Sequence, residues 1–324
     1  MKKIIITVVA ILILIIILIL IPRKNNKIKV SEVTHSPFYA PFYVALEQGY
    51  FKEEGLDIEL LLTPGADKVS AAVLSGDVLI GLAGAESALY VYQNGSDDYL
   101  VPFSGLTKRD GQFIVGRDKD FKWQDLIGKE VLVGRKGGMP VLNFLKALEN
   151  QGIDKDKVNI NYSIDYASLS GAFISGVGDF VNLFEPNATM IQEEGYGYVL
   201  DSIGTKSLEM PYTVFYTKKS TFLNNKQLIK KFCKAMQKGL DYVYEHSAED
   251  IAMVILPQFK DTDINDLAIY IKNYKEADSW VRDTFISEDL LNNLEEFLIQ
   301  NGLLDKKVAY EDIILNYEWF SFSG

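Results

Sequence analysis

The sequence predicts an α/β fold built as two lobes, preceded by a separate apolar segment. Short β-rich runs alternate with helix-length amphipathic runs from Ile28 to Lys218. Two polar links interrupt this alternation about a hundred residues apart. An apolar run of 18 residues, Ile4 to Ile21, with basic residues on both sides, precedes the first expected strand. These three observations define the expected architecture.

Period and composition predict the elements in chain order. The expected strands are Ile28–Val33, Ile58–Leu62, Val78–Leu82, Leu100–Leu106, Phe113–Gly116, Val131–Gly134, Val158–Tyr162, Asp179–Phe184, Tyr198–Asp201 and Thr213–Thr217. The helices expected between them are Pro41–Gln48, Lys68–Leu74, Glu86–Gln93, Pro140–Asn150, Ala167–Ile174 and Asn187–Glu194. Only helices are expected afterwards: Phe222–Glu245, Ala248–Leu256, Asn265–Tyr274, Glu288–Gln300 and Tyr310–Leu315. Such alternation predicts parallel sheets.

The two polar links predict where the chain passes between lobes. Residues 107–111 form the first link and residues 209–212 the second, and each lies beside an expected strand. We therefore expect residues 28–111 and 212–324 to form lobe 1 and residues 112–211 to form lobe 2. Two lobes joined by two strands enclose a cleft that can open and close about a hinge.

Residues 1–27 predict an N-terminal membrane anchor or uncleaved signal. The 18-residue run from Ile4 to Ile21 would be roughly 27 Å long as a helix, near the lower limit for a membrane core of about 30 Å. No A-x-A-like cleavage site follows it, and the only cysteine is Cys233, so no lipid-bearing cysteine is available. Counting the flanking basic residues slightly favours a cytoplasmic body.

Charge and composition exclude several function classes. The formal charge of −11 becomes −16 from Ile28 onward, because residues 1–27 hold five Lys/Arg and no acid. Nucleic acid is therefore not the expected partner. One cysteine and two histidines give no reason to expect a metal or cofactor. The H-E-x-x-H, G-x-S-x-G and C-x-x-C motifs are absent, so we do not expect an enzyme.

The candidate binding residues lie where strands end and helices begin. In an α/β sheet ligands bind at this edge, where backbone N–H groups are free and glycines permit close approach. Six such turns occur in the two expected lobes. The candidates in these turns and links are Ser36, Tyr39, Phe42, Gly65, Ala66, Gly84, Glu86, Asp110, Gly137, Gly138, Asp165, Tyr166, Glu185 and Tyr212.

Several candidates also have a purely structural interpretation. Of the four aromatic residues at positions 38, 39, 42 and 43, we expect two to pack the first helix, which leaves Tyr39 or Phe42 to stack on a ligand. Glu185 fits a helix N-cap about as well as a ligand contact, and Glu86 fits a cap somewhat better. Cys233 fits a buried apolar position in a helix.

The segment from Ser36 to Ile58 resembles the opening of a known family. Gly49–Ile58 is similar to that family's "GYF..EGLDV" turn, and further similarities occur in order at Pro64–Ala66, Ile80–Gly84, Asp125–Val131 and Gly134–Gly138. The family comprises the solute-binding proteins of ABC importers that take thiamine pyrimidine precursors, aliphatic sulfonates, taurine or nitrate.

The resemblance implies a type II periplasmic-binding-protein fold, in which a monomer closes two lobes on a small molecule. The ligand then passes to a membrane permease driven by a cytoplasmic ATPase. This implication outweighs the charge count, so we expect the body outside the cell membrane, on a single-pass anchor. The anchor departs from common family members, because the lipid-bearing cysteine is missing.

Within this family, a cleft carboxylate and stacking aromatics suit a flat ring that carries amino groups. Glu185 falls at a suitable position for that carboxylate, so we expect a small nitrogen heterocycle similar to a thiamine pyrimidine precursor. The alternatives are an alkanesulfonate, taurine or nitrate, or an enzyme on the same fold similar to the yeast-type pyrimidine synthase. That enzyme's cysteine-rich motif has no counterpart in this sequence.

Overall fold

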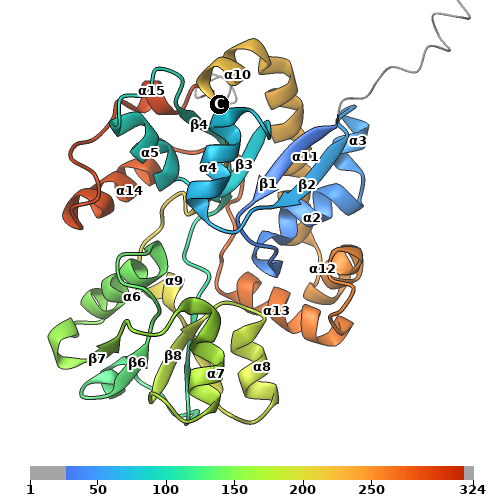
Figure 1. The fold of residues 1–324 in the computed structure, drawn as a ribbon. Coiled ribbons are helices and arrows are strands. Elements are labelled where there is room, and N and C mark those ends of the chain that lie inside the picture. Colours follow the sequence, from blue (N-terminus) through green and yellow to red (C-terminus); the bar gives the residue numbers. More distant parts are fainter. Residues whose placement is uncertain (1–26, 317–324) are drawn as a thin grey trace, which may run out of the picture.

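The computed structural model describes residues 27–316 and contains two five-stranded sheets (Figure 1). The first sheet has the order β2 (Ile58–Leu62), β1 (Ile28–Glu32), β3 (Ile80–Gly84), β10 (Thr213–Lys218), β4 (Leu100–Thr107). The second has the order β7 (Asn159–Asn161), β6 (Glu130–Leu132), β8 (Phe180–Leu183), β5 (Phe113–Gly116), β9 (Tyr198–Ser202). All ten expected strands are therefore present, with ends shifted by at most two residues.

The prediction of parallel sheets is wrong for one strand in each sheet. β10 pairs antiparallel with β3 and β4, and β5 pairs antiparallel with β8 and β9. The reason is the path of the chain. β5 and β10 are the first strands after the chain has passed from one sheet to the other. Each starts at the edge of its sheet where its neighbouring strands end, so it runs antiparallel to them. The remaining pairs, β1 with β2 and β3 and β6 with β7 and β8, are parallel as expected.

Helices cover both sheets. Four helices follow strands of the second sheet along the chain: α6 (Met139–Asn150), α7 (Leu169–Ile174), α8 (Asn187–Glu193) and α9 (Ile203–Lys206). The others are α2 (Ala40–Glu47), α3 (Tyr50–Glu53), α4 (Ala66–Ser75), α5 (Glu86–Gln93), α10 (Lys219–Asn224), α11 (Lys226–Glu245), α12 (Ala248–Ile255), α13 (Ile264–Glu276), α14 (Glu288–Gln300) and α15 (Tyr310–Ile313). Short 3-10 helices occur at Pro37–Tyr39, Trp123–Leu126, Lys155–Lys157, Tyr166–Ser168 and Leu256–Gln258.

The single helix expected from Phe222 to Glu245 is two helices. The break lies at Asn225, whose backbone leaves the helical region (φ −129°, ψ 33°) and whose side chain donates to the carbonyl of Thr221. Asparagine favours such local hydrogen bonds over a continuous helix. The expected sequence elements did not include α3 and α9, which are single turns of four residues.

Two short backbone segments connect the sheets and lie side by side. Met210 N–H donates to the carbonyl of Lys108, and Tyr212 N–H donates to the carbonyl of Thr107, both over 3.0 Å. Lys108 Nζ lies 2.6 Å from Asp278 Oδ2, and Arg109 forms an ion pair with Glu209. The division into lobe 1 (28–111 and 212–324) and lobe 2 (112–211) stays our proposal, and the strand content of each sheet is compatible with it.

Helix α13 belongs to the C-terminal part of the chain but contacts the other sheet's helices. Asn273 Nδ2 donates to Glu185 Oε1 over 2.6 Å, just before α8, and Figure 1 shows α13 beside α8. Tyr274 Oη also accepts from the N–H of Glu185 over 3.1 Å. The two proposed lobes are therefore joined by side-chain contacts as well as by the two connecting segments.

The predicted membrane anchor, residues 1–27, lies almost entirely outside the described residues. Within residues 27–316, none of the helices combines the length and the apolar character that a membrane span requires.

Close packing between α2 and α11 gives the first prediction. Gly239 lies inside α11, and a Cβ there would overlap the carbonyl oxygen of Pro41 and lie 3.0 Å from the Cβ of Ala45. Gly239→Ala should therefore lower the free energy of unfolding by about 1–3 kcal/mol, although alanine is the better helix former. Urea unfolding measures this change.

Gly171 in α7 is the matched control. It is exposed, and a Cβ there would meet nothing within 4 Å. Gly171→Ala should raise stability by roughly 0.5–1 kcal/mol. If both substitutions stabilise the protein, the described approach of α2 to α11 is wrong.

Candidate functional site

A cavity of about 1020 Å³ lies between the two sheets, at the ends of their strands. All six strand-to-helix turns expected to meet there contribute lining residues. Four of these turns follow β1, β3, β6 and β8, the fifth precedes α4, and the sixth contributes Tyr166. The second connecting segment adds Tyr212. The sequence prediction that these turns share one cleft therefore agrees with the geometry.

Most of the predicted site residues line this cavity. Those that do are Ser36, Tyr39, Gly65, Ala66, Gly84, Glu86, Gly137, Gly138, Tyr166, Glu185 and Tyr212. Three of the candidates, Phe42, Asp110 and Asp165, are not among the lining residues.

Phe42 is a core residue. Its side chain is 0% exposed and packs edge-on against Phe51 and Phe215, at centroid distances of 5.8 and 5.1 Å. Of the two stacking candidates, Tyr39 is therefore the one at the cavity. Phe38, which was not one of the two stacking candidates, also lines it and contacts Tyr274 at a centroid distance of 4.9 Å.

Asp110 and Asp165 lie outside the cavity for opposite reasons. Asp110 is buried behind Tyr212, whose hydroxyl donates to Asp110 Oδ2 over 2.6 Å, and its other oxygen accepts from the N–H of Gln112. Burial raises the pKa of Asp110 to about 7. Asp165 is exposed, at the start of the short helical turn that carries Tyr166. Asp110 is thus placed to orient Tyr212 and does not contact the cavity itself.

Glu185 lines the cavity, but its carboxylate is already occupied. Thr189 donates through its N–H to Oε2 and through its hydroxyl to Oε1, over 3.0 and 2.8 Å. Asn273 supplies the third bond, to Oε1. The side chain is 2% exposed, and burial raises its pKa despite these bonds. Glu185 therefore binds the first turn of α8 and ties it to α13. Its expected role as the ligand's acceptor stays a prediction, with three hydrogen bonds from the protein already on the carboxylate.

Glu86 is the contrasting carboxylate. It begins α5 and lines the cavity, and within residues 27–316 the only hydrogen bond that acts on its carboxylate comes from its own backbone N–H. Burial raises the pKa of Glu86 to about 7. The predicted capping role of Glu86 is wrong, because Ala85 is the N-cap residue of α5 and no side chain caps this helix.

His35 lines the cavity and has acceptors on both sides. Its Nδ1 lies 2.6 Å from Glu32 Oε1, and its Nε2 lies 2.9 Å from the carbonyl oxygen of Gln258. Tyr43 donates to the other oxygen of Glu32 over 2.6 Å. An imidazolium, which donates from both nitrogens, fits this arrangement. The hydrogen bond to Glu32 raises the pKa of His35.

The sequence prediction missed part of the cavity wall. Tyr90 lies in α5, Phe184 ends the β8 region, and Thr213 begins β10. A one-turn spacing from Glu86 to Tyr90 indicates a shared helix face, so Tyr90 could have been found. Thr213 and Phe184 gave no comparable signal, because a strand-end residue can point to either side of the sheet.

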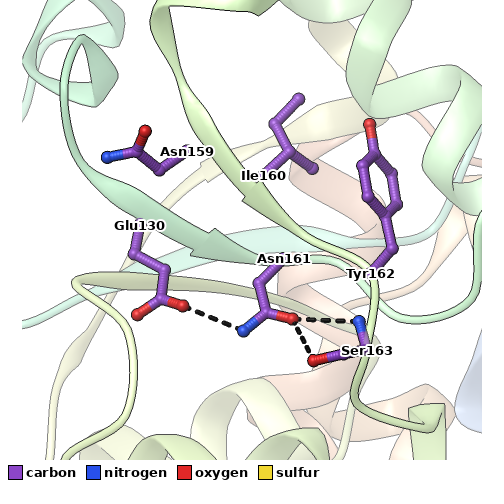
Figure 2. Close-up of a pocket in the computed structure, with 6 residues that line it drawn as sticks. All are labelled: Glu130, Asn159, Ile160, Asn161, Tyr162 and Ser163. Carbon is purple, nitrogen blue, oxygen red and sulfur yellow. Dashed lines mark hydrogen bonds between the residues drawn. The ribbon is translucent and has the colours of Figure 1, made fainter.

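A second hollow, of about 530 Å³, lies on edge strand β7 (Figure 2). Asn161 occupies its centre, donating to Glu130 Oε1 over 2.9 Å and accepting from both the N–H and the hydroxyl of Ser163. These polar groups satisfy one another, and all the lining residues come from β7, the residues next to it and Glu130. The hollow therefore presents no group that converges on a ligand.

Metal binding finds no support in the described part of the chain. No group of three or more His, Cys, Asp or Glu side chains is arranged there to hold an ion. Cys233 is buried in α11, and burial raises the pKa of its thiol to about 12, so it behaves as the expected apolar core residue.

The paired imidazolium of His35 predicts a pH-dependent stability. Its folded-state pKa lies above the ordinary value of 6.5, so its contribution is fully present below about pH 6.5 and is lost as pH rises through the raised pKa. The stability difference between wild type and His35→Gln should therefore be largest near pH 6 and shrink toward pH 9. Urea unfolding across this range measures it; a difference that grows with pH would contradict the assignment.

Comparison with known proteins gives consistent results. Residues 36–250 match the family model described as "NMT1/THI5 like". The "Putative binding protein YtlA" of Bacillus subtilis is 40% identical over 291 residues, which cover 89% of this chain and 87% of YtlA. A "4-amino-5-hydroxymethyl-2-methylpyrimidine phosphate synthase" of Candida albicans is 28% identical over 251 residues, covering 72% and 70%.

Among solved structures, the periplasmic aliphatic sulphonate binding protein SsuA of Escherichia coli has the same fold, with a TM-score of 0.71 at 16% identity, over 90% of this chain and 97% of SsuA. The periplasmic-binding-protein-like α/β fold with two sheets, expected from the sequence, is thereby confirmed. The family model spans well over half of the chain, and the relative at 40% identity spans most of it. The chain therefore belongs to the NMT1/THI5-like family.

Proposed function

We propose that this protein is an extracytoplasmic solute-binding protein of an ABC importer. The main observation that supports this function is the cavity of about 1020 Å³ between two sheets that are joined by two adjacent connecting segments. Such a geometry suits a clamp that closes on a small molecule. The family membership, the name of the Bacillus relative and the fold shared with a sulphonate-binding protein support the proposal. As a type II binding protein, it would act as a monomer and deliver its ligand to a permease and its ATPase.

The proposed ligand is a small nitrogen heterocycle, similar to a thiamine pyrimidine precursor. Aromatic side chains from both proposed lobes support it: Phe38, Tyr39 and Tyr90 from one, Tyr166 and Phe184 from the other. Flat rings gain from contact with such faces. Because Glu185 is occupied by Thr189 and Asn273, the proposal now depends on these aromatics. An alkanesulfonate, taurine or nitrate is the alternative ligand.

The proposed location is the outer face of the cell membrane, with residues 1–27 as the anchor. This location suits delivery to a permease, which an importer's binding protein must reach from outside. Protease treatment of intact cells tests it: the body should be digested, whereas full protection would place it in the cytoplasm.

A ligand screen tests the function. Aminopyrimidines, thiamine, riboflavin, alkanesulfonates, taurine and nitrate are added singly, and thermal unfolding is recorded. A ligand present at 100 times its Kd should stabilise the protein by about 2.7 kcal/mol. We expect aminopyrimidines to act most strongly, and stabilisation by sulfonates alone would favour the alternative. Failure of every compound would contradict the solute-binding function.

Two exposed tyrosines provide a matched comparison for this screen. Tyr166 lines the cavity and is 38% exposed, whereas Tyr198, on β9, is 43% exposed and is not among the lining residues. Tyr166→Ala should weaken aminopyrimidine binding roughly tenfold or more, and Tyr198→Ala should leave it unchanged. Mass spectrometry should recover the ligand unaltered; a product would instead favour the enzyme alternative.

A further inference from the structure

Glu86 holds its carboxylate against the backbone at the cavity wall. It is the first residue of α5, and a Cβ placed on Gly84 would overlap both of its carboxylate oxygens. The side chain therefore lies directly over Gly84, two residues earlier at the end of β3. Any larger residue at position 84 would displace it. The absence of a side chain at Gly84 thus leaves room for the Glu86 carboxylate at the cavity wall.

No cation or donor from another residue compensates Glu86 within the described part of the chain. The three buried acids near the cavity are all compensated: Glu185 by Thr189 and Asn273, Glu32 by His35 and Tyr43, and Asp110 by Tyr212 and Gln112. Glu86 has only its own N–H. Glu86 is partly buried at the cavity wall. A carboxylate placed there without a cation or donor from another residue is free to bind a partner from outside the chain.

The titratable groups that face Glu86 are four tyrosines. Its charge helps to raise the pKa of Tyr39, Tyr90, Tyr212 and Tyr216, which come from a 3-10 helix, α5, the second connecting segment and β10. Three of their hydroxyls have other partners: Thr213 for Tyr39, Asp110 for Tyr212 and Ser70 for Tyr216. The groups that act on Glu86 are therefore aromatic. The positive groups that line the same cavity, Arg135 and the paired His35, are not among those that shift the pKa of Glu86. Aromatic rings and a carboxylate together are suited to an organic cation.

We infer that Glu86 is the group that binds the ligand's positively charged nitrogen, so that the site takes its ligand as an organic cation of the amidinium or ammonium class. This inference rests on the proposed function and narrows its ligand class. It also replaces Glu185 by Glu86 as the carboxylate that reads the ligand. The opposite chemistry, in which a protonated Glu86 donates to an oxyanion, predicts the opposite ligand charge and the opposite proton exchange.

Three compounds that share a phenyl ring and differ in the charge of its substituent separate these chemistries: benzamidinium, benzamide and benzenesulfonate. Titration calorimetry of the full chain measures the Kd of each at pH 6 and pH 8. At pH 7, two buffers of different ionisation enthalpy report the protons exchanged. Benzamidinium should bind more tightly than the other two. Since burial raises the pKa of Glu86 to about 7, benzamidinium affinity should fall about tenfold from pH 8 to pH 6, and binding at pH 7 should release protons.

Two variants test whether the affinity for benzamidinium depends on Glu86. Glu86→Gln should weaken benzamidinium binding about 10- to 100-fold and remove its pH dependence, because a charge-assisted hydrogen bond is lost. Glu288→Gln is the matched control, since Glu288 is the exposed first residue of α14 and should leave the affinity unchanged. Thermal unfolding of both variants without ligand checks that they remain folded.

Several results would overturn the inference. Benzenesulfonate binding with proton uptake would show that Glu86 is a donor to anions, while the solute-binding function would stand. Benzamidinium binding that Glu86→Gln does not change would move the cation site elsewhere. Absence of benzamidinium binding at millimolar concentration would also contradict the inference. Failure of the proposed function itself is recognised separately, by the absence of any ligand in the solute screen.

Discussion

The arrangement of the whole molecule depends on two short backbone segments that run side by side between the sheets. The N–H groups of Met210 and Tyr212 donate to the carbonyls of Lys108 and Thr107, so neither segment can move far without the other. Lys108, Arg109, Glu209 and Asp278 surround them with ion pairs. Because the chain enters each sheet at the same edge, the strand ends of both sheets face a common space. The cavity is a direct consequence of this connection.

Side-chain contacts add further links between the two connecting segments, the cavity wall and the two sheets. Asp110 lies on the first segment and accepts from Tyr212 on the second, so a side chain that lines the cavity is bound to the pair of segments. On the far side, Glu185 links the start of α8 to Asn273 of α13. Phe38 contacts both Tyr274 and Phe184, at centroid distances of 4.9 and 6.0 Å. A ligand that presses on these aromatics would therefore act on contacts that join the two proposed lobes.

Much of this architecture was predictable from the sequence, and the errors have physical causes. Strand ends and helix starts are local features, so the turns that line the cavity could be found without the structure. The side that a residue faces is not always local. Every residue from Ala40 to Ala45 in α2 is buried, because α11 and the first sheet cover this helix, so its pattern could not separate Phe42 from Tyr39. Likewise, the occupation of Glu185 depends on Asn273, which lies 88 residues later in the chain.

The two proposed lobes should close on a solute held in the cavity. Double electron–electron resonance measures the distance between two spin labels. Labels at Asp77→Cys, beyond α4, and at Glu149→Cys, in α6, would report the distance between the lobes. Both positions are exposed, and the native Cys233 is buried, so only the introduced thiols would be labelled. With the compound that stabilises the protein most, we expect a shorter and narrower distance distribution. A distribution that the compound leaves unchanged would show that the lobes do not close on it.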